Sequence, residues 1–165
     1  MDQIKIRTAK ENDFMSISLL AGKCSPMVTE RNSIFHIFTK FFQNTVFIAE
    51  TNENKIKRII GFLIGFISQS DSSDAYIHLL CVDSDFRGKG IAYQLVMEFL
   101  KYVKKMNCRS VYLITKPVNH NAIQFYQKLG FKIFSESDEI ETDKINAIKD
   151  YNGPGEHMVV FKKDL

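Results

Sequence analysis

The sequence has little of what marks secreted, disulfide-stapled or membrane-spanning proteins. Its 165 residues include no tryptophan, three prolines and three cysteines without a CxxC pair. An odd and widely spaced set of cysteines argues against a disulfide framework and favours a reducing compartment. The longest apolar run, residues 59–67, is far too short to span a membrane, and no apolar segment of signal-peptide length begins the chain. We therefore expect a cytoplasmic protein with no membrane partner.

Strong charge of either sign is also missing. The net charge is +3, and the lysines are scattered apart from two adjacent pairs. That excess is too small to favour binding to nucleic acid. His78 and Cys81 would supply only two ligands, so the sequence predicts no metal site. What remains is a globular composition, 45% hydrophobic and 25% charged, with a length that suits a single domain over residues 1–165.

The apolar patterns predict a mixed α/β chain in the order βααβββαβαββ. Strands are expected at 4–7, 45–50, 59–68, 75–82, 110–115, 131–134 and 157–163, and helices at 11–22, 29–44, 91–106 and 119–129. The strand at 59–68 does not alternate, which is typical of burial on both faces. The acidic segment 135–143 is expected to be a solvated loop, and attraction of a cationic acceptor such as a polyamine or an amino sugar is the alternative. The phenylalanines of the second helix suit core packing, a substrate wall or a dimer contact.

The segment that joins the strand at 75–82 to the helix at 91–106 resembles an anion site. Gly88 and Gly90 leave space where the helix begins, and Arg87 and Lys89 add positive charge. The first amides of a helix have no partners within it, and the helix dipole adds partial positive charge there. The amides of residues 87–92 are therefore suited to hold a diphosphate. The spacing fits neither a P-loop nor a dinucleotide fingerprint, and a tight turn with nothing bound is the alternative.

Two linked motifs point to a family. The first is [Q/R]-x-x-G-x-[G/A], matched by Arg87, Gly90 and Ala92 and preceded by I-x-x-L-x-V, matched by Ile77, Leu80 and Val82. The second follows about thirty residues later, where "NHNAIQFYQKLGF" (119–131) fits N-x-x-A-x-x-F-Y-x-K-x-G-F. Together they closely resemble the GNAT superfamily of acyl-CoA-dependent N-acyltransferases. The motifs cover residues 75–134, and the element order extends the resemblance over nearly the whole chain.

This resemblance implies a fold and a cofactor. The fold would be a twisted mixed sheet of about seven strands with four helices, in which the parallel strands 75–82 and 110–115 splay apart. Acetyl-CoA would enter between them as co-substrate, without a metal. The residues expected to bind it are Leu80, Cys81, Val82, Arg87, Gly88, Lys89, Gly90, Ile91, Ala92, Asn119, Asn121 and Tyr126.

The resemblance also implies a reaction, the transfer of acetyl from acetyl-CoA to a primary amine by direct attack in a ternary complex. Tyr126 is expected to protonate the leaving thiolate, and the Val82 N–H to polarise the thioester carbonyl. His78 occupies a position where many relatives carry glutamate, so it is the candidate general base. A chain of ordered waters is the alternative, with Glu50 and Asp74 as further candidates. An acyl-cysteine route through Cys81 also stays open.

The acceptor is not determined by these patterns. The resemblance places its site among residues 22–42, 68–75 and 135–158, with Phe35, His36 and Phe38 as candidate lining residues. The partner would be a small-molecule or peptide amine, and a homodimer is left open. The alternative function is a non-catalytic, regulatory acyl-CoA-binding domain of the same fold.

Overall fold

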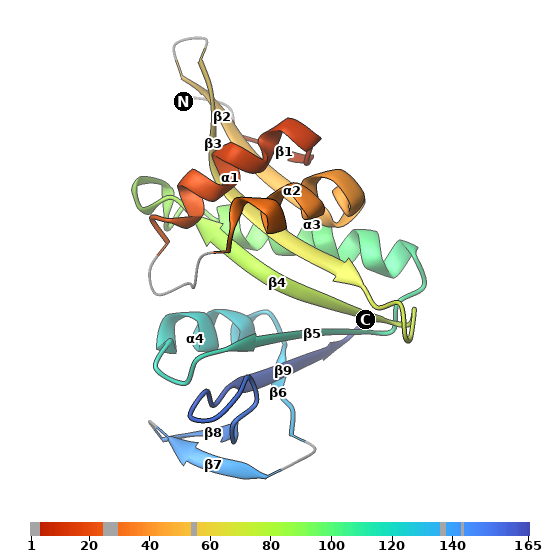
Figure 1. Cartoon of the computed structure of the whole chain (residues 1–165), viewed down its shortest axis with the longest axis vertical. Coiled ribbons are helices and arrows are strands. Elements are labelled where there is room, and N and C mark those ends of the chain that lie inside the picture. Colours follow the sequence, from red (N-terminus) through yellow and green to blue (C-terminus); the bar gives the residue numbers. More distant parts are fainter. Residues whose placement is uncertain (1–3, 25–29, 54–55, 136–137, 143) are drawn as a thin grey trace.

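A seven-stranded mixed sheet forms the centre of the molecule (Figure 1). The computed structural model describes residues 4–24, 30–53, 56–135, 138–142 and 144–165. The strands, in their order across the sheet, are β1 (Lys5–Thr8), β2 (Val46–Glu53), β3 (Ile56–Ile67), β4 (Asp74–Val82), β5 (Ser110–Thr115), β9 (Val159–Asp164) and β6 (Lys132–Ile133). Neighbouring strands run antiparallel except for β4 and β5, which are parallel. The predicted α/β class and mixed sheet are confirmed.

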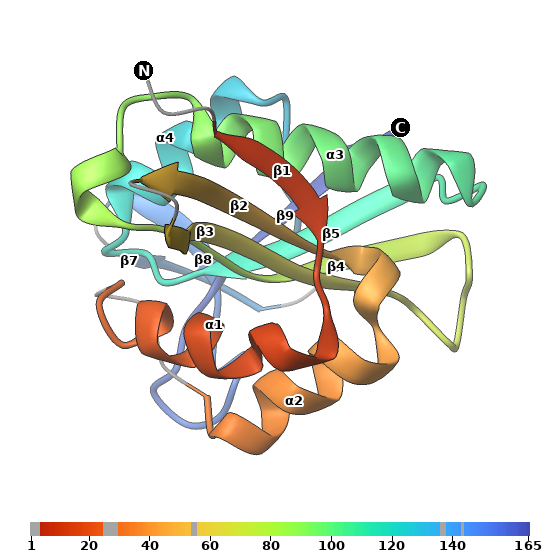
Figure 2. The same ribbon diagram turned by 90° about the horizontal axis from the view of Figure 1, so that it is seen from above.

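Four α-helices cover the two faces of this sheet. They are α1 (Phe14–Ala21), α2 (Asn32–Phe41), α3 (Ile91–Lys105) and α4 (His120–Lys128), and 3-10 turns lie at Glu11–Asp13, Gln43–Thr45 and Ser84–Phe86. Figure 2 shows α1 and α2 on one side of the sheet and α3 on the other. In β3, Phe62 and Ile64 belong to the core under α1 and α2, while Leu63 belongs to the core under α3. The predicted burial of this strand on both faces is therefore confirmed.

The predicted loop at 135–143 is partly wrong. Glu139–Thr142 forms β7, which pairs antiparallel with β8 (Ile145–Ile148) in a separate two-stranded sheet. Along β7 exposure alternates, and Ile140 packs against the main core. The acidic composition concealed this period of two. Residues 136, 137 and 143 of the predicted loop lie outside the described part.

The parallel strands β4 and β5 separate after a short paired stretch. Their register runs from Asp74↔Ser110 to Ile77↔Leu113 and then stops, although β4 continues to Val82 and β5 to Thr115. Figure 1 shows the two strands diverging toward α4. The predicted splayed pair is thus confirmed, and its parting leaves backbone groups of both strands available to a ligand.

A β-bulge interrupts β4 at His78. The pairing with β3 passes from Ile64↔Leu79 to Gly65↔Ile77, so His78 is the extra residue. A bulge re-aims the side chains around it and increases the local twist. Gly65 lies opposite, and a Cβ there would collide with the Phe99 ring and come within 2.7 Å of the Tyr76 carbonyl oxygen. The close approach of α3 to the bulge therefore requires glycine at this position.

The expectation that the cysteines stay unpaired is wrong. Cys24 and Cys81 form a disulfide, with their Cα atoms 6.0 Å apart and 57 residues between them in sequence. The pair arises because the end of α1 packs over the end of β4, where Leu20 and both cysteines share one core cluster. Cys108 is a free and buried thiol. Sequence spacing carried no sign of this contact, because only the packing of helix on strand creates it.

Candidate functional site

The loop before α3 is shaped by two left-handed glycines. Gly88 and Gly90 have φ of 75° and 76°, a backbone conformation that costs other L-residues about 1–2 kcal/mol. A Cβ at either position would meet no atom within 4 Å. Backbone conformation, not crowding, therefore favours glycine there. Gly90 is also the N-cap residue of α3, so the first amides of a fifteen-residue helix open onto this space.

A cleft of about 570 Å³ lies against that loop, between β4, α3 and α4. We call it the loop cleft. All the residues predicted to bind the cofactor line it except Lys89. The Lys89 ammonium instead donates to the Asp85 carbonyl oxygen at 3.3 Å and lies 4.6 Å from the centre of the Phe86 ring. The lining residues that the sequence reasoning missed are Cys24, Phe86, Tyr93, Ala122 and Phe125. Phe125 and Ala122 belong to the motif already noted, so that motif was the available signal.

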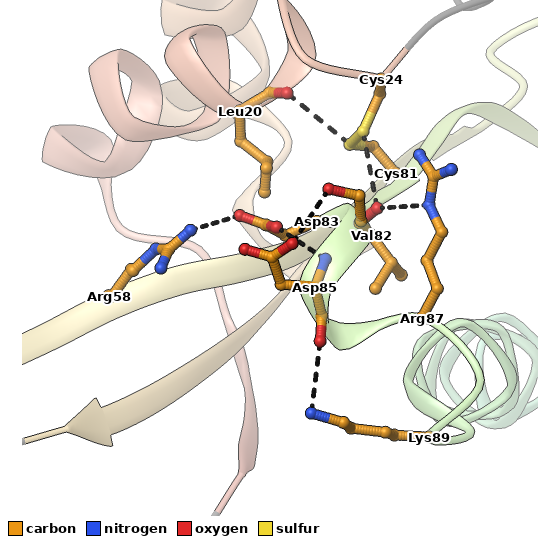
Figure 3. Close-up of polar contacts among 10 residues, drawn as sticks. Leu20, Cys24, Arg58, Cys81, Val82, Asp83, Asp85, Arg87 and Lys89 are labelled. Carbon is orange, nitrogen blue, oxygen red and sulfur yellow. Dashed lines mark hydrogen bonds and ion pairs between the residues drawn. A yellow bond between two sulfur atoms is a disulfide. The ribbon is translucent and has the colours of Figure 1, made fainter.

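The end of β4 presents polar backbone groups to the loop cleft. The Asp83 amide donates to the Ile60 carbonyl oxygen of β3 at 2.8 Å. Because successive residues of a strand point their backbone groups to opposite sides, the N–H and C=O of Val82 face away from β3. The Arg87 Nε donates to that Val82 carbonyl oxygen at 3.1 Å, as Figure 3 shows. Arg87 thereby ties the glycine loop to the strand.

Asn119 positions the other wall of the loop cleft. It is the N-cap residue of α4, and its Oδ1 accepts a hydrogen bond from the Ala122 amide at 3.3 Å. This capping fixes where the helix begins. Asn121 in the first turn and Tyr126 one turn further along line the same cleft. The predicted residues of the second motif are therefore brought together with those of the first.

A second cleft, of about 470 Å³, lies where β4 and β5 part. We call it the bulge cleft, because Tyr76 and His78 line it from the bulged part of β4. Residues of the loop before β9 and of the chain before α2 complete it, among them Glu30 and Glu156. Four residues line both clefts, namely Leu80, Asn119, Ala122 and Tyr126. Two ligands, one in each cleft, would therefore meet beside Tyr126.

Tyr126 is buried at this junction and is 7% exposed. Its ring packs against Phe125, Phe131 and Phe161. Burial raises the pKa of the Tyr126 phenol well above its ordinary range, and Tyr76 adds to the effect. The group therefore keeps its proton at any physiological pH and is suited to donate it. Burial also raises the pKa of Tyr76 to about 12.

His78 is held between a carboxylate and an aromatic ring. Its Nε2 lies 3.2 Å from Glu30 Oε1, and its ring stacks on Phe38 with 5.6 Å between the centres. The Glu30 carboxylate therefore orients the imidazole. Sequence reasoning missed Glu30 and Tyr76. Tyr76 precedes His78 by two residues on the same strand, and that spacing was a usable signal.

Several other candidates lie elsewhere. Glu50 accepts a hydrogen bond from Arg7 at 2.8 Å, and neither Glu50 nor Asp74 lines the bulge cleft. Of the expected acceptor residues, Phe35 is fully buried in the core, and His36 contacts Glu11 at 2.9 Å. Cys81 is joined to Cys24, so the acyl-cysteine route has no free thiol in this form.

Metal-binding clusters and helices able to span a membrane are both absent from the described residues. No group of three or more histidine, cysteine, aspartate or glutamate side chains there is arranged to hold a metal ion. Among the helices that the structure describes, none combines the length and apolarity needed to cross a membrane.

Comparison with known proteins finds relatives that include acetyltransferases. The chain is 37% identical over 90 residues to an uncharacterized N-acetyltransferase of Methanocaldococcus jannaschii, covering 52% of this chain and 38% of that protein. It is 29% identical over 96 residues to the L-2,4-diaminobutyric acid acetyltransferase of Vibrio cholerae, covering 57% and 52%. The matches to these two relatives thus span about a third to a half of their own length.

Solved structures show the same fold over the full chain. The NatC complex bound to Gag peptide and CoA contains a chain with a TM-score of 0.80 and 20% identity, covering 99% of both chains. Ard1 from Thermoplasma volcanium gives a TM-score of 0.77 at 22% identity, covering 98% of this chain and 97% of that one. The sequence model of the acetyltransferase (GNAT) family matches residues 17–131. This range includes both motifs and the four residues that line both clefts. The chain therefore belongs to the acetyltransferase (GNAT) family.

Proposed function

We propose that this protein transfers an acetyl group from acetyl-CoA to a primary amine, by direct attack in a ternary complex. One observation carries the proposal. The loop cleft and the bulge cleft share Leu80, Asn119, Ala122 and Tyr126. A thioester held in the first and an amine held in the second would have their reacting atoms at this junction.

The loop cleft suits acetyl-CoA along its length. The amides of residues 87–92 would hold the diphosphate at the start of α3, where Gly88 and Gly90 allow close approach. The edge of β4 from Leu80 to Val82 would pair with the pantetheine amides, as an added strand would. Asn119 and Asn121 line the same cleft and would face the pantetheine arm. Lys89 is proposed to contribute only its amide, because its ammonium is bound to Asp85.

The chemistry assigns one role to each group at the junction. A neutral amine attacks the thioester carbonyl carbon, and the oxygen gains negative charge that the Val82 N–H would stabilise. When the tetrahedral intermediate collapses, the C–S bond breaks, and Tyr126 would donate its proton to the departing sulfur. The raised pKa of Tyr126 keeps that proton in place until it is needed. His78, oriented by Glu30, would take the proton that the amine releases.

The acceptor is proposed to be a small-molecule amine or a peptide amine. The bulge cleft carries charges of both signs, and the Lys116 ammonium lies 3.2 Å from the Glu156 carboxylate within it. Relatives of both kinds exist. One is a diaminobutyrate acetyltransferase from Paenibacillus lautus in complex with L-2,4-diaminobutyric acid and coenzyme A, and another is the NatC complex with its peptide.

Homodimer formation and a cytoplasmic location remain predictions. The α1–α2 face exposes Leu19 and Phe41, whose exposed fractions of 68% and 71% would suit a contact between two copies. The disulfide removes one argument for a reducing compartment.

Two measurements test the proposed function. Thermal melting with acetyl-CoA, ATP or NAD should show stabilisation of several degrees by acetyl-CoA alone. Release of free CoA thiol should then appear with at least one member of a panel of small amines and peptides. Stabilisation without release for any amine would favour the regulatory, non-catalytic domain, and stabilisation by ATP or NAD alone would refute acetyl-CoA binding.

A further inference from the structure

The disulfide lies in the wall of the loop cleft. Cys24 and Cys81 are 6% and 3% exposed, and both line that cleft. Their Cα separation of 6.0 Å is within the ordinary range for a disulfide and needs no movement of the backbone. A small reagent would therefore reach the sulfur atoms through the space in which the cofactor is proposed to bind. Cys108, the third cysteine of the chain, is buried near Ser72 and lines neither cleft.

The pair is connected to the elements that shape the cleft. Figure 3 shows Cys24 and Arg87 converging on the carbonyl oxygen of Val82, where Cys24 Sγ lies at 3.8 Å and Arg87 Nε at 3.1 Å. On the other side, Cys81 Sγ lies 3.8 Å from the carbonyl oxygen of Leu20 in α1. The disulfide thus joins the end of α1 to β4 at Cys81. The next residue of that strand, Val82, anchors the glycine loop through Arg87.

The same bond also fixes a residue between α1 and α2. Cys24 is the third residue after α1, and Glu30, shortly before α2, contacts His78. A covalent bond between Cys24 and β4 holds Cys24 against the strand. Breaking the bond leaves this residue held by non-covalent packing alone.

We propose that Cys24 and Cys81 form a reversible thiol–disulfide exchange site, for low-molecular-weight thiols and disulfides, that sets the affinity of the loop cleft. This rests on the proposed function, since the loop cleft is where acetyl-CoA is placed. The disulfide form has the open cleft described above and is the form that binds the cofactor more tightly, because its wall is already fixed. The dithiol form has to order that wall on binding.

The exchange balances without any further reagent. A thiolate RS⁻ attacks one sulfur of the Cys24–Cys81 bond, that S–S bond breaks, and the other cysteine leaves as a thiolate. A second RS⁻ attacks the R sulfur of the mixed disulfide, which releases the remaining cysteine and RSSR. In total, the protein disulfide and two RSH give two protein thiols and RSSR. Oxidation by RSSR is the same sequence in reverse.

The test measures binding and linkage on the full chain. The protein is equilibrated with glutathione or with glutathione disulfide, and the linkage of Cys24 to Cys81 is read by peptide mass spectrometry after free thiols are alkylated. Affinity is measured by calorimetry with a thioether analogue of acetyl-CoA, which has no thiol and cannot reduce the protein. We expect the dissociation constant to rise at least threefold on reduction. The analogue should also slow reduction at least threefold, because it fills the route to the sulfur atoms.

Variants assign the effect to this pair. The ratio of the two dissociation constants should fall to one in Cys24→Ser and in Cys81→Ala, and should be unchanged in Cys108→Ser. Using two alternative variants guards against one that fails to fold. If the Cys24–Cys81 linkage is absent under glutathione disulfide, the proposal is overturned. It is also overturned if the oxidised and reduced forms bind the analogue with equal affinity and the analogue does not slow reduction of the disulfide. The affinity and linkage measurements need no amine acceptor. They therefore test the disulfide proposal even if no acetyl transfer to an amine is found. If the analogue does not bind in either state, acetyl-CoA binding and the affinity effect are both refuted.

Discussion

Replacing Gly90 by aspartate tests where the diphosphate binds. Gly90 begins α3 with a φ of 76°, and the space beyond its Cα is open. A side chain there costs about 1–2 kcal/mol of folding stability from the left-handed backbone. Aspartate adds a full negative charge beside the proposed phosphates. Two unit charges 4 Å apart repel by about 4 kcal/mol at an effective dielectric constant of about 20.

The open cleft screens part of this repulsion, so we expect a loss of about 2–4 kcal/mol in binding. That corresponds to an affinity about 30- to 1,000-fold weaker. Calorimetry with CoA measures it directly. Gly90→Asn is the matched control, because asparagine has the same shape, tolerates the left-handed region and carries no charge. Added salt should narrow the difference between the two variants. Equal losses in both variants would refute the electrostatic reasoning, and unchanged affinity in Gly90→Asp would refute the placement of the phosphates.

Four other outcomes are expected. Tyr126→Phe should lower turnover at least tenfold (about 10²–10⁴-fold is typical of a lost general acid) and leave CoA affinity nearly unchanged. His78→Ala should remove the acidic limb of the pH–rate profile. Gly65→Ala should destabilise the fold by about 1–3 kcal/mol in urea titrations, since its Cβ would meet the Phe99 ring and the Tyr76 carbonyl. Acid should destabilise the fold through Asp13, whose pKa is lowered because hydrogen bonds from Arg7 and the Lys10 amide outweigh the opposing effect of burial. A lowered carboxyl pKa stabilises the fold above the ordinary value of 3.8, and this contribution is lost as the pH falls.

Each of these has a discriminating control. An unimpaired Tyr126→Phe enzyme would remove the tyrosine from the mechanism, and an unchanged pH profile would do the same for His78. Gly22→Ala is the reference for Gly65→Ala, because the φ of Gly22 is −60° and an added Cβ would lie an ordinary 3.7 Å from the Leu19 carbonyl oxygen. In Asp13→Asn, the free energy of unfolding should fall less between pH 7 and pH 3 than it does in the unmodified protein. An equally large fall in both would show that other carboxylates dominate.

The sequence predicted the parts of this molecule that depend on local patterns. The helix at 91–106 and the strands at 75–82 and 110–115 agree with α3, β4 and β5 within a residue or two, because their apolar periodicity is strong. The two glycines before α3 were singled out because they leave space for an anion at the helix start, whereas their positive φ is a finding of the structure.

The rest depends on contacts between distant segments. The Cys24–Cys81 bond and the Glu30–His78 contact each join the region after α1 to β4, and their partners are separated by dozens of residues. The β7–β8 hairpin was missed because charged residues on its exposed face hid the alternation. The direction of the Lys89 side chain follows from the ring of Phe86 beside it, which a sequence pattern cannot place.

The short seam between β4 and β5 has a further consequence. In the described part of the sheet, four residue pairs join β4 to β5, and side chains from both sides of this seam, such as Leu95 of α3 and Ile123 of α4, belong to one core cluster. A small rotation about this seam would alter the space beyond it and would have to be accommodated by that shared core. We expect the length of acyl chain that fits to depend on how the two halves of the sheet pack against one another across this seam. Substitutions at the seam, remote from the reacting atoms, are where donor preference would be changed.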